Sequence, residues 1–148
     1  MSGGVKRPRV AHPFLFALFP ILALYAYNIK SIPVPMREAA GPLALSLGCA
    51  VGLFILLKTW LKDAVRSGLL VSLILIWFFS FGHIAERVSA WTGGIFNRSL
   101  FFALTIVFGV LAYLAVRSRR DLGGLTRTLN IAAATLVAFN LASVGQTL

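Results

Sequence analysis

SGLLVSLILIWFFSFGHIA, residues Ser67–Ala85, is a stretch of nineteen residues without a formal charge. Arg66 precedes it and Glu86 follows it. An α-helix needs about 20 predominantly apolar residues to cross the ~30 Å hydrocarbon core of a bilayer. The stretch therefore predicts a transmembrane helix, and the charges on both sides predict where that helix leaves the lipid.

Four further stretches of similar length carry no charge, two on each side of the first. The chain is 59% hydrophobic and 12% charged, and its mean hydropathy is +0.89. Soluble domains are about 25% charged, so this composition excludes an ordinary soluble protein. We expect an all-α membrane protein, a bundle of five transmembrane helices that follows a short basic tail over residues 1–9. The predicted spans are residues 10–29, 39–57, 67–85, 99–116 and 128–148.

The formal net charge is +10, and the distribution of the cations along the chain predicts its orientation in the membrane. The cations gather in the short connectors, which carry no groove-reading motif, and this favours contact with membrane lipids over nucleic acid. One side of the predicted bundle carries ten cations and the other carries four. Because cytoplasmic connectors are enriched in Lys and Arg, we expect a cytoplasmic N-terminus and an extracytoplasmic C-terminus in the inner (plasma) membrane. The ten are Lys6, Arg7, Arg9, Lys58, Lys62, Arg66, Arg117, Arg119, Arg120 and Arg127, and the four are Lys30, Arg37, Arg87 and Arg98.

Small residues recur at every fourth position in the second predicted span, at Ala44, Gly48 and Gly52. This spacing places them on one helix face, where a partner helix can approach closely. Simple tolerance of glycine in membrane helices explains the pattern equally well. The last span repeats the pattern at Ala134, Ala138 and Ala142, and it also carries Asn130 and Asn140, which we expect to hydrogen-bond to another helix.

His83, Glu86 and Arg87 form a polar cluster at the outer end of the third span. Spacings of three and four residues place them on one helical face, where they can bind a lipid headgroup. The alternative is an interfacial cap, in which the charges only mark the end of the span. His12 lies at the opposite interface, so it is not expected to join this cluster.

Catalytic chemistry has little support in these 148 residues. Among the hydroxyls within the spans, only Ser80 has a histidine nearby, three residues before His83, and Ser72 is expected to have none. Cys49 is the single cysteine. We assign no catalytic residue, metal ligand or cofactor, and whether the protein is an enzyme stays open. The glycine pairs at Gly93 and Gly123 predict turns.

Two segments, HPFLFALFPILALYAYNI (His12–Ile29) and FFSFGHI (Phe78–Ile84), carry a family resemblance. They resemble the N-terminal membrane part of bacterial sulfatase-like hydrolase/transferases, relatives of lipoteichoic acid synthase and of phosphoglycerol or phosphoethanolamine transferases. The resemblance implies several spans, often five, that lead to an extracytoplasmic catalytic domain. That family's metal ligands and catalytic residue belong to a domain outside these residues, so none is carried over.

The resemblance therefore implies a membrane anchor module of an envelope-modifying transferase or hydrolase, with a lipid-linked substrate as a candidate partner. The last predicted span ends at Leu148 without a flanking charge. A chain cut short after this residue fits the anchor. A complete small multi-span membrane protein, acting as an assembly partner or a carrier, is the alternative.

Overall fold

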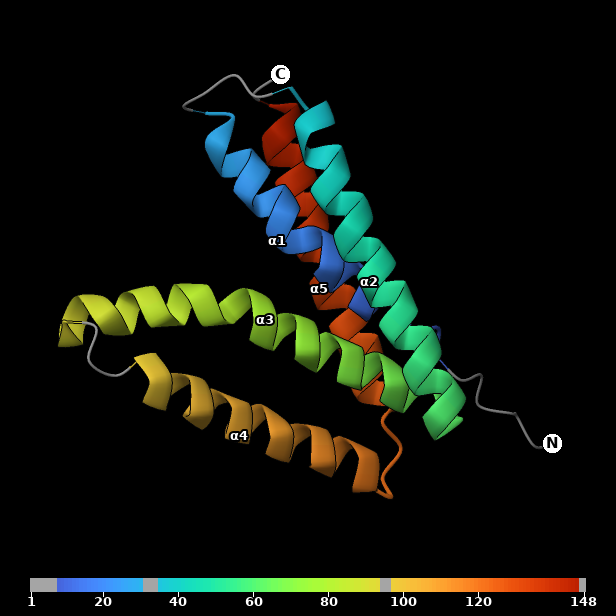
Figure 1. Ribbon diagram of the computed structural model, residues 1–148. Helices are drawn as coiled ribbons and strands as arrows, with labels where there is room; N and C mark the ends of the chain where they lie inside the picture. Colours follow the sequence, from blue (N-terminus) through green and yellow to red (C-terminus); the bar gives the residue numbers. More distant parts are fainter. Residues whose placement is uncertain (1–7, 31–34, 94–96, 147–148) are drawn as a thin grey trace.

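A computed structural model describes residues 8–30, 35–93 and 97–146 (Figure 1). Within these ranges the chain is all-helical, as predicted. Most of the predicted basic tail, the second glycine of the first glycine pair and the last two residues of the fifth span lie outside the described residues. The helices are α1 (His12–Asn28), α2 (Arg37–Leu61), α3 (Ala64–Thr92), α4 (Asn97–Arg117) and α5 (Gly123–Gly145).

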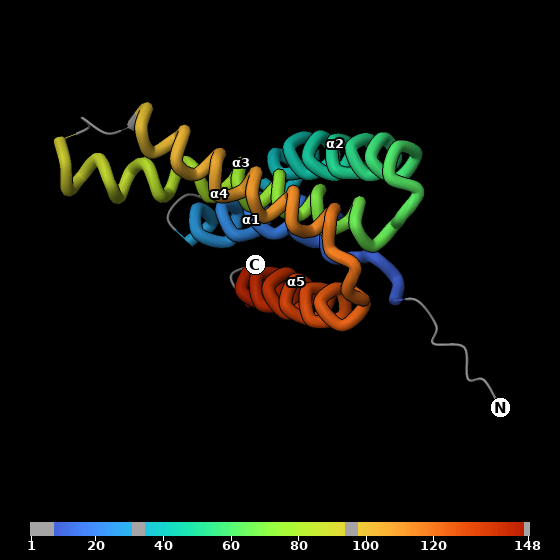
Figure 2. Tube along the Cα trace, turned by 90° about the horizontal axis from the view of Figure 1, so that it is seen from below, coloured from blue at the N-terminus to red at the C-terminus, as the bar shows by residue number. Residues whose placement is uncertain are grey.

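Helix α1 lies at the centre of the bundle, since it packs against α2, α3 and α5. Figure 2 shows α1 between α2 and α5, with the α3–α4 pair on one side of that layer. One buried cluster joins α1, α2 and α3 around Ala17, Ala50 and Val71. A second cluster joins the end of α1 to α2 and α5 around Tyr25 and Val144. In the described part of the chain, α4 packs against α3 alone.

Four helices are long and apolar enough to cross a membrane: α2, α3, α4 from Arg98 onward, and α5. The protein is therefore a multi-pass membrane protein by helix length and composition. Helix α1 is apolar but has 17 residues, which corresponds to about 26 Å at ~1.5 Å per residue. It is slightly shorter than the hydrocarbon core, and its central position surrounds it with other helices.

The helices extend beyond the charge-free stretches that predicted them. Helix α3 starts at Ala64 because the Asp63 carboxylate accepts hydrogen bonds from the backbone N–H groups of Val65 (2.9 Å) and Arg66 (3.1 Å), which caps the first turn. It ends at Thr92, and the following residue, Gly93, has a φ of +66°, the left-handed conformation that glycine adopts at low cost. The turn predicted at Gly123 is wrong, because Gly123 begins α5.

The small-residue faces of α2 and α5 do not form the packed surfaces of this chain. A Cβ atom built at Gly48 or Gly52 would meet nothing within 4 Å. The repeat in α5 is also exposed at each of its three alanines, and a different set of side chains faces the bundle. That buried set consists of Gly123, Thr126, Ala133, Val137 and Val144. The α2 repeat is thus open to a partner helix, whereas the α5 repeat did not identify the face that packs.

Candidate functional site

The predicted cluster of His83, Glu86 and Arg87 lines a groove between α1 and α3. The groove has a volume of about 970 Å³. All three side chains are solvent-exposed, as expected for residues near a helix end. The lining residues are Phe16, Phe19, Pro20, Ala23, Leu24 and Tyr27 of α1, and Leu75, Ile76, Phe79, Ser80, His83, Glu86 and Arg87 of α3.

The groove exists because α3 packs into the bundle over only part of its length. The buried residues of α3 all lie between Ser67 and Leu75. Beyond Leu75 the helix diverges from α1, and Figure 1 shows the C-terminal half of α3 separated from the α1–α2–α5 group. Since the facing surfaces of α1 and α3 are both apolar, their separation leaves an apolar groove that opens toward the C-terminal ends of the two helices.

Polarity changes along the groove. The α3 wall is apolar from Leu75 to Phe79, and its polar residues follow from Ser80 to Arg87. Leu75 and Arg87 are twelve positions apart, about 18 Å along a helix axis. We call Tyr27, Ser80, His83, Glu86 and Arg87 the mouth of the groove. An apolar wall with a polar mouth matches the division of a lipid into chain and headgroup.

The two charges at the mouth have no partner in the described part of the chain. Ion pairs there join Arg37 to Glu38 (3.6 Å) and Arg66 to Asp63 (3.7 Å). Neither the side chain of Glu86 nor that of Arg87 makes a hydrogen bond or an ion pair with any described residue. Both are therefore free to bind a ligand or to be solvated as an interfacial cap, and headgroup binding stays a prediction.

A second polar site, which the sequence did not predict, joins the start of α1 to α3. His12 is fully buried and Ser72 is 2% exposed, and the distance from His12 Nδ1 to Ser72 Oγ is 2.6 Å. The expectation that Ser72 has no histidine nearby is wrong, because α1 packs across the N-terminal half of α3. His12 lies at the opposite end of α1 from the mouth. His12 and Ser72 are sixty positions apart in the sequence, so no local sequence pattern links them.

Asn130 on α5 caps the start of α1 from another helix. Its Oδ1 accepts hydrogen bonds from the backbone N–H groups of Ala11 (3.0 Å) and His12 (2.8 Å), and its Nδ2 donates to the carbonyl of Arg9 (2.7 Å). This confirms the interhelical bond predicted for Asn130. The same prediction for Asn140 is wrong, since its amide donates to the Leu136 carbonyl of its own helix.

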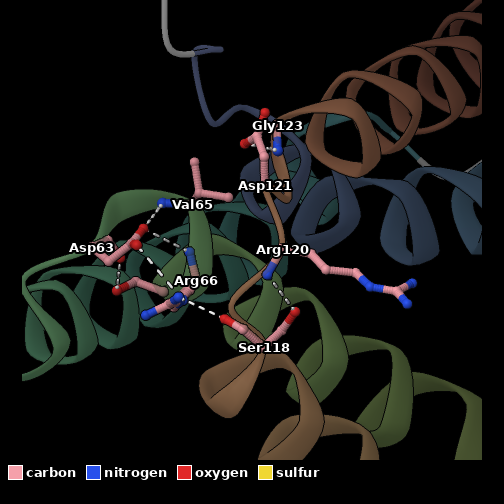
Figure 3. A network of polar contacts seen from close by, with 8 residues as sticks. Asp63, Val65, Arg66, Ser118, Arg120, Asp121 and Gly123 are labelled. Carbon is pink, nitrogen blue, oxygen red and sulfur yellow. Dashed lines mark hydrogen bonds and ion pairs between the residues drawn. The ribbon is translucent and has the colours of Figure 1, made fainter.

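The basic connectors meet at one end of the bundle. The guanidinium of Arg66 donates to the carbonyl of Ser118 (2.7 Å), and the backbone N–H of Arg120 donates to Ser118 Oγ (3.2 Å). Figure 3 shows this network, which joins the α2–α3 connection to the α4–α5 connection. Asp63 and Asp121 lie in the same region. Alternate crossings of a membrane require these connectors to share an end, and the side of the membrane that they face stays a prediction.

The two segments that carry the family resemblance both contribute to the groove. His12–Ile29 contains α1, which forms one wall, and Phe78–Ile84 places Ser80 and His83 at the mouth. In the described residues, no group of three His, Cys, Asp or Glu side chains lies close enough together to hold a metal ion. Comparisons of this chain with protein-family models, curated proteins and solved structures found no match.

Proposed function

We propose that this protein is the membrane-embedded part of an envelope-modifying transferase or hydrolase, and that the groove between α1 and α3 holds a lipid or lipid-linked molecule. One observation carries the proposal: a groove of about 970 Å³ combines apolar walls with unpaired charges at one end. This volume is at the upper end of the ~300–1,000 Å³ typical of small-molecule sites. It is large enough for a chain-like ligand.

The apolar walls alone do not select a ligand. Lipid tails are as apolar as the side chains of a membrane helix, so an acyl chain gains little free energy by leaving the bulk lipid for the groove. Selection must then come from the polar mouth, where Glu86 and Arg87 are unpaired in the described chain. A headgroup bound there places the attached chain along the apolar walls. This arrangement presents a lipid at a fixed position and depth.

The topology supports a role next to an extracytoplasmic domain. If the five helices cross the membrane alternately, α1, α3 and α5 end on the same side, although Figure 1 shows the C-terminal end of α3 apart from those of α1 and α5. The cation count predicts that this side is extracytoplasmic. A catalytic domain attached after α5 would then face the headgroup of a lipid held in the groove. Residues of this chain would position the lipid, and the attached domain would act on it.

The test is lipid retention by the purified chain. Ala23→Phe adds a ring to the groove wall, whereas Ala138→Phe adds the same ring to the exposed face of α5. Each protein is extracted in mild detergent, and the bound lipid per chain is counted by mass spectrometry. We expect Ala138→Phe to match the unmodified chain and Ala23→Phe to lose about tenfold, since overfilling a packed site costs roughly 1–3 kcal/mol. Equal retention by all three proteins would contradict the proposal.

The exposed repeat on α2 favours a second candidate function, that of an assembly partner. Gly48 and Gly52 leave open space on the outer face of α2, and the free Cys49 is exposed next to them. If this face packs against a second copy, the chain purified in mild detergent should be a dimer by light scattering. A chain that is monomeric in mild detergent would exclude self-association through this face.

A further inference from the structure

The mouth of the groove carries one negative and one positive side chain in adjacent positions. Glu86 and Arg87 are both exposed, and neither is paired within the described chain. His83 lies about one helical turn before them, on the same face of α3. Tyr27, which is 75% exposed, lines the same groove from α1. The formal charge of this group is zero when the histidine is neutral.

We propose that the groove binds a zwitterionic phospholipid, whose headgroup joins a phosphate to an ammonium group; this inference rests on the function proposed above. The guanidinium of Arg87 and a ring N–H of His83 are donors suited to the phosphate. The carboxylate of Glu86 pairs with the ammonium.

An anionic headgroup fits the mouth less well. It offers one negative charge to Arg87, but it leaves the carboxylate of Glu86 unpaired beside a like charge, which disfavours binding. The opposite end of the bundle differs sharply. There, eight cations in the described part of the chain accompany only Asp63 and Asp121, so that end suits anionic lipids. The two ends of the bundle therefore select different headgroups, and the groove selects the zwitterionic one.

The experiment compares phosphatidylethanolamine and phosphatidylglycerol with identical acyl chains. Each lipid is titrated into the delipidated chain in detergent, and bound lipid is measured by native mass spectrometry. The variants are Glu86→Gln and Arg87→Gln. The matched control is Glu38→Gln, because Glu38 is the other glutamate at this end, pairs with Arg37 and does not line the groove.

We expect the unmodified chain and Glu38→Gln to prefer phosphatidylethanolamine by about threefold, within the range of exposed ion pairs. Glu86→Gln should abolish or reverse this preference, because it removes the partner of the ammonium. Arg87→Gln should weaken both lipids, because both contain a phosphate. Equal binding of the two lipids by the unmodified chain, or a preference that survives Glu86→Gln, would overturn the inference.

The failure of this inference is distinguishable from the failure of the proposed function. If Ala23→Phe releases both lipids while Glu86→Gln leaves their ratio unchanged, the groove holds lipid without selecting the zwitterionic headgroup. If Ala23→Phe retains both lipids as well as the unmodified chain does, the groove is not the binding site, and both proposals fail.

Discussion

Replacing Asn130 with Ala should destabilise the bundle by about 2 kcal/mol. The side chain makes three hydrogen bonds with the backbone at Arg9, Ala11 and His12, and it links α5 to the first turn of α1. Interhelical polar contacts in membranes average ~0.6 kcal/mol each, and the loss of an N-terminal cap costs ~0.5–2 kcal/mol. Ala11 provides no side-chain cap of its own, so the first turn of α1 depends on Asn130.

The assay is reversible unfolding in mixed detergent micelles with increasing fractions of dodecyl sulfate, followed by circular dichroism. Asn140→Ala is the matched control, because it removes the same amide from the same helix, where that amide bonds only to the Leu136 carbonyl one turn earlier. The control should change the free energy of unfolding by less than about 0.5 kcal/mol. If the two variants were equally stable, the Asn130 contacts would not hold α1 in place, and the reasoning would be refuted.

Four further substitutions test the packing of α3 and α4 in the same unfolding assay. Gly68→Ala should destabilise by roughly 1–3 kcal/mol, because its Cβ would overlap the side chain of Val10, just before α1. Gly109→Ala on the exposed face of α4 should be neutral or stabilising by up to about 1 kcal/mol, and equal effects of the two substitutions would contradict the close approach at Gly68. Asp63→Ala removes the cap of α3 and should cost about 1 kcal/mol, and no change would mean that solvent replaces the cap. Ser72→Ala leaves the buried His12 Nδ1 without its partner, at a cost of about 1–3 kcal/mol; unchanged stability would show that this bond contributes nothing.

The helical class and the four long apolar helices were predictable because a bilayer imposes a strict rule. A backbone N–H or C=O group that is unpaired in the hydrocarbon costs several kcal/mol, and an α-helix pairs these groups within one segment. A charge-free stretch such as Ser67–Ala85 is therefore expected to form a helix. Helix ends were less predictable. Charged side chains can continue a helix in the headgroup layer, and α3 accordingly runs on through Glu86 and Arg87 to Thr92.

The interhelical contacts depended on packing that no local spacing encodes. The pair formed by His12 and Ser72 requires the start of α1 to cross the N-terminal half of α3. The packed face of α5 passes through Thr126, Asn130 and Ala133 rather than through the regular alanine repeat. Small residues mark a surface that permits close approach, but the shape of the neighbouring helix decides whether the approach occurs.

The candidate site was predictable in part. Spacings of three and four residues predicted that His83, Glu86 and Arg87 share a face of α3, and all three line the groove. The α1 wall, from Phe16 to Tyr27, did not follow from the sequence, because it depends on where α3 leaves the bundle. That divergence follows the last buried residue of α3, Leu75.

Cysteine accessibility in intact cells tests the central claim most directly: the helices cross a membrane, and the groove mouth lies on the side opposite the basic connectors. In a Cys49→Ser background, single cysteines replace the exposed residues Ala90, at the end of α3, and Arg119, between α4 and α5. A membrane-impermeant maleimide should label Ala90→Cys in intact cells and Arg119→Cys only after permeabilisation. Labelling of both positions from outside, or the reverse pattern, would contradict the account.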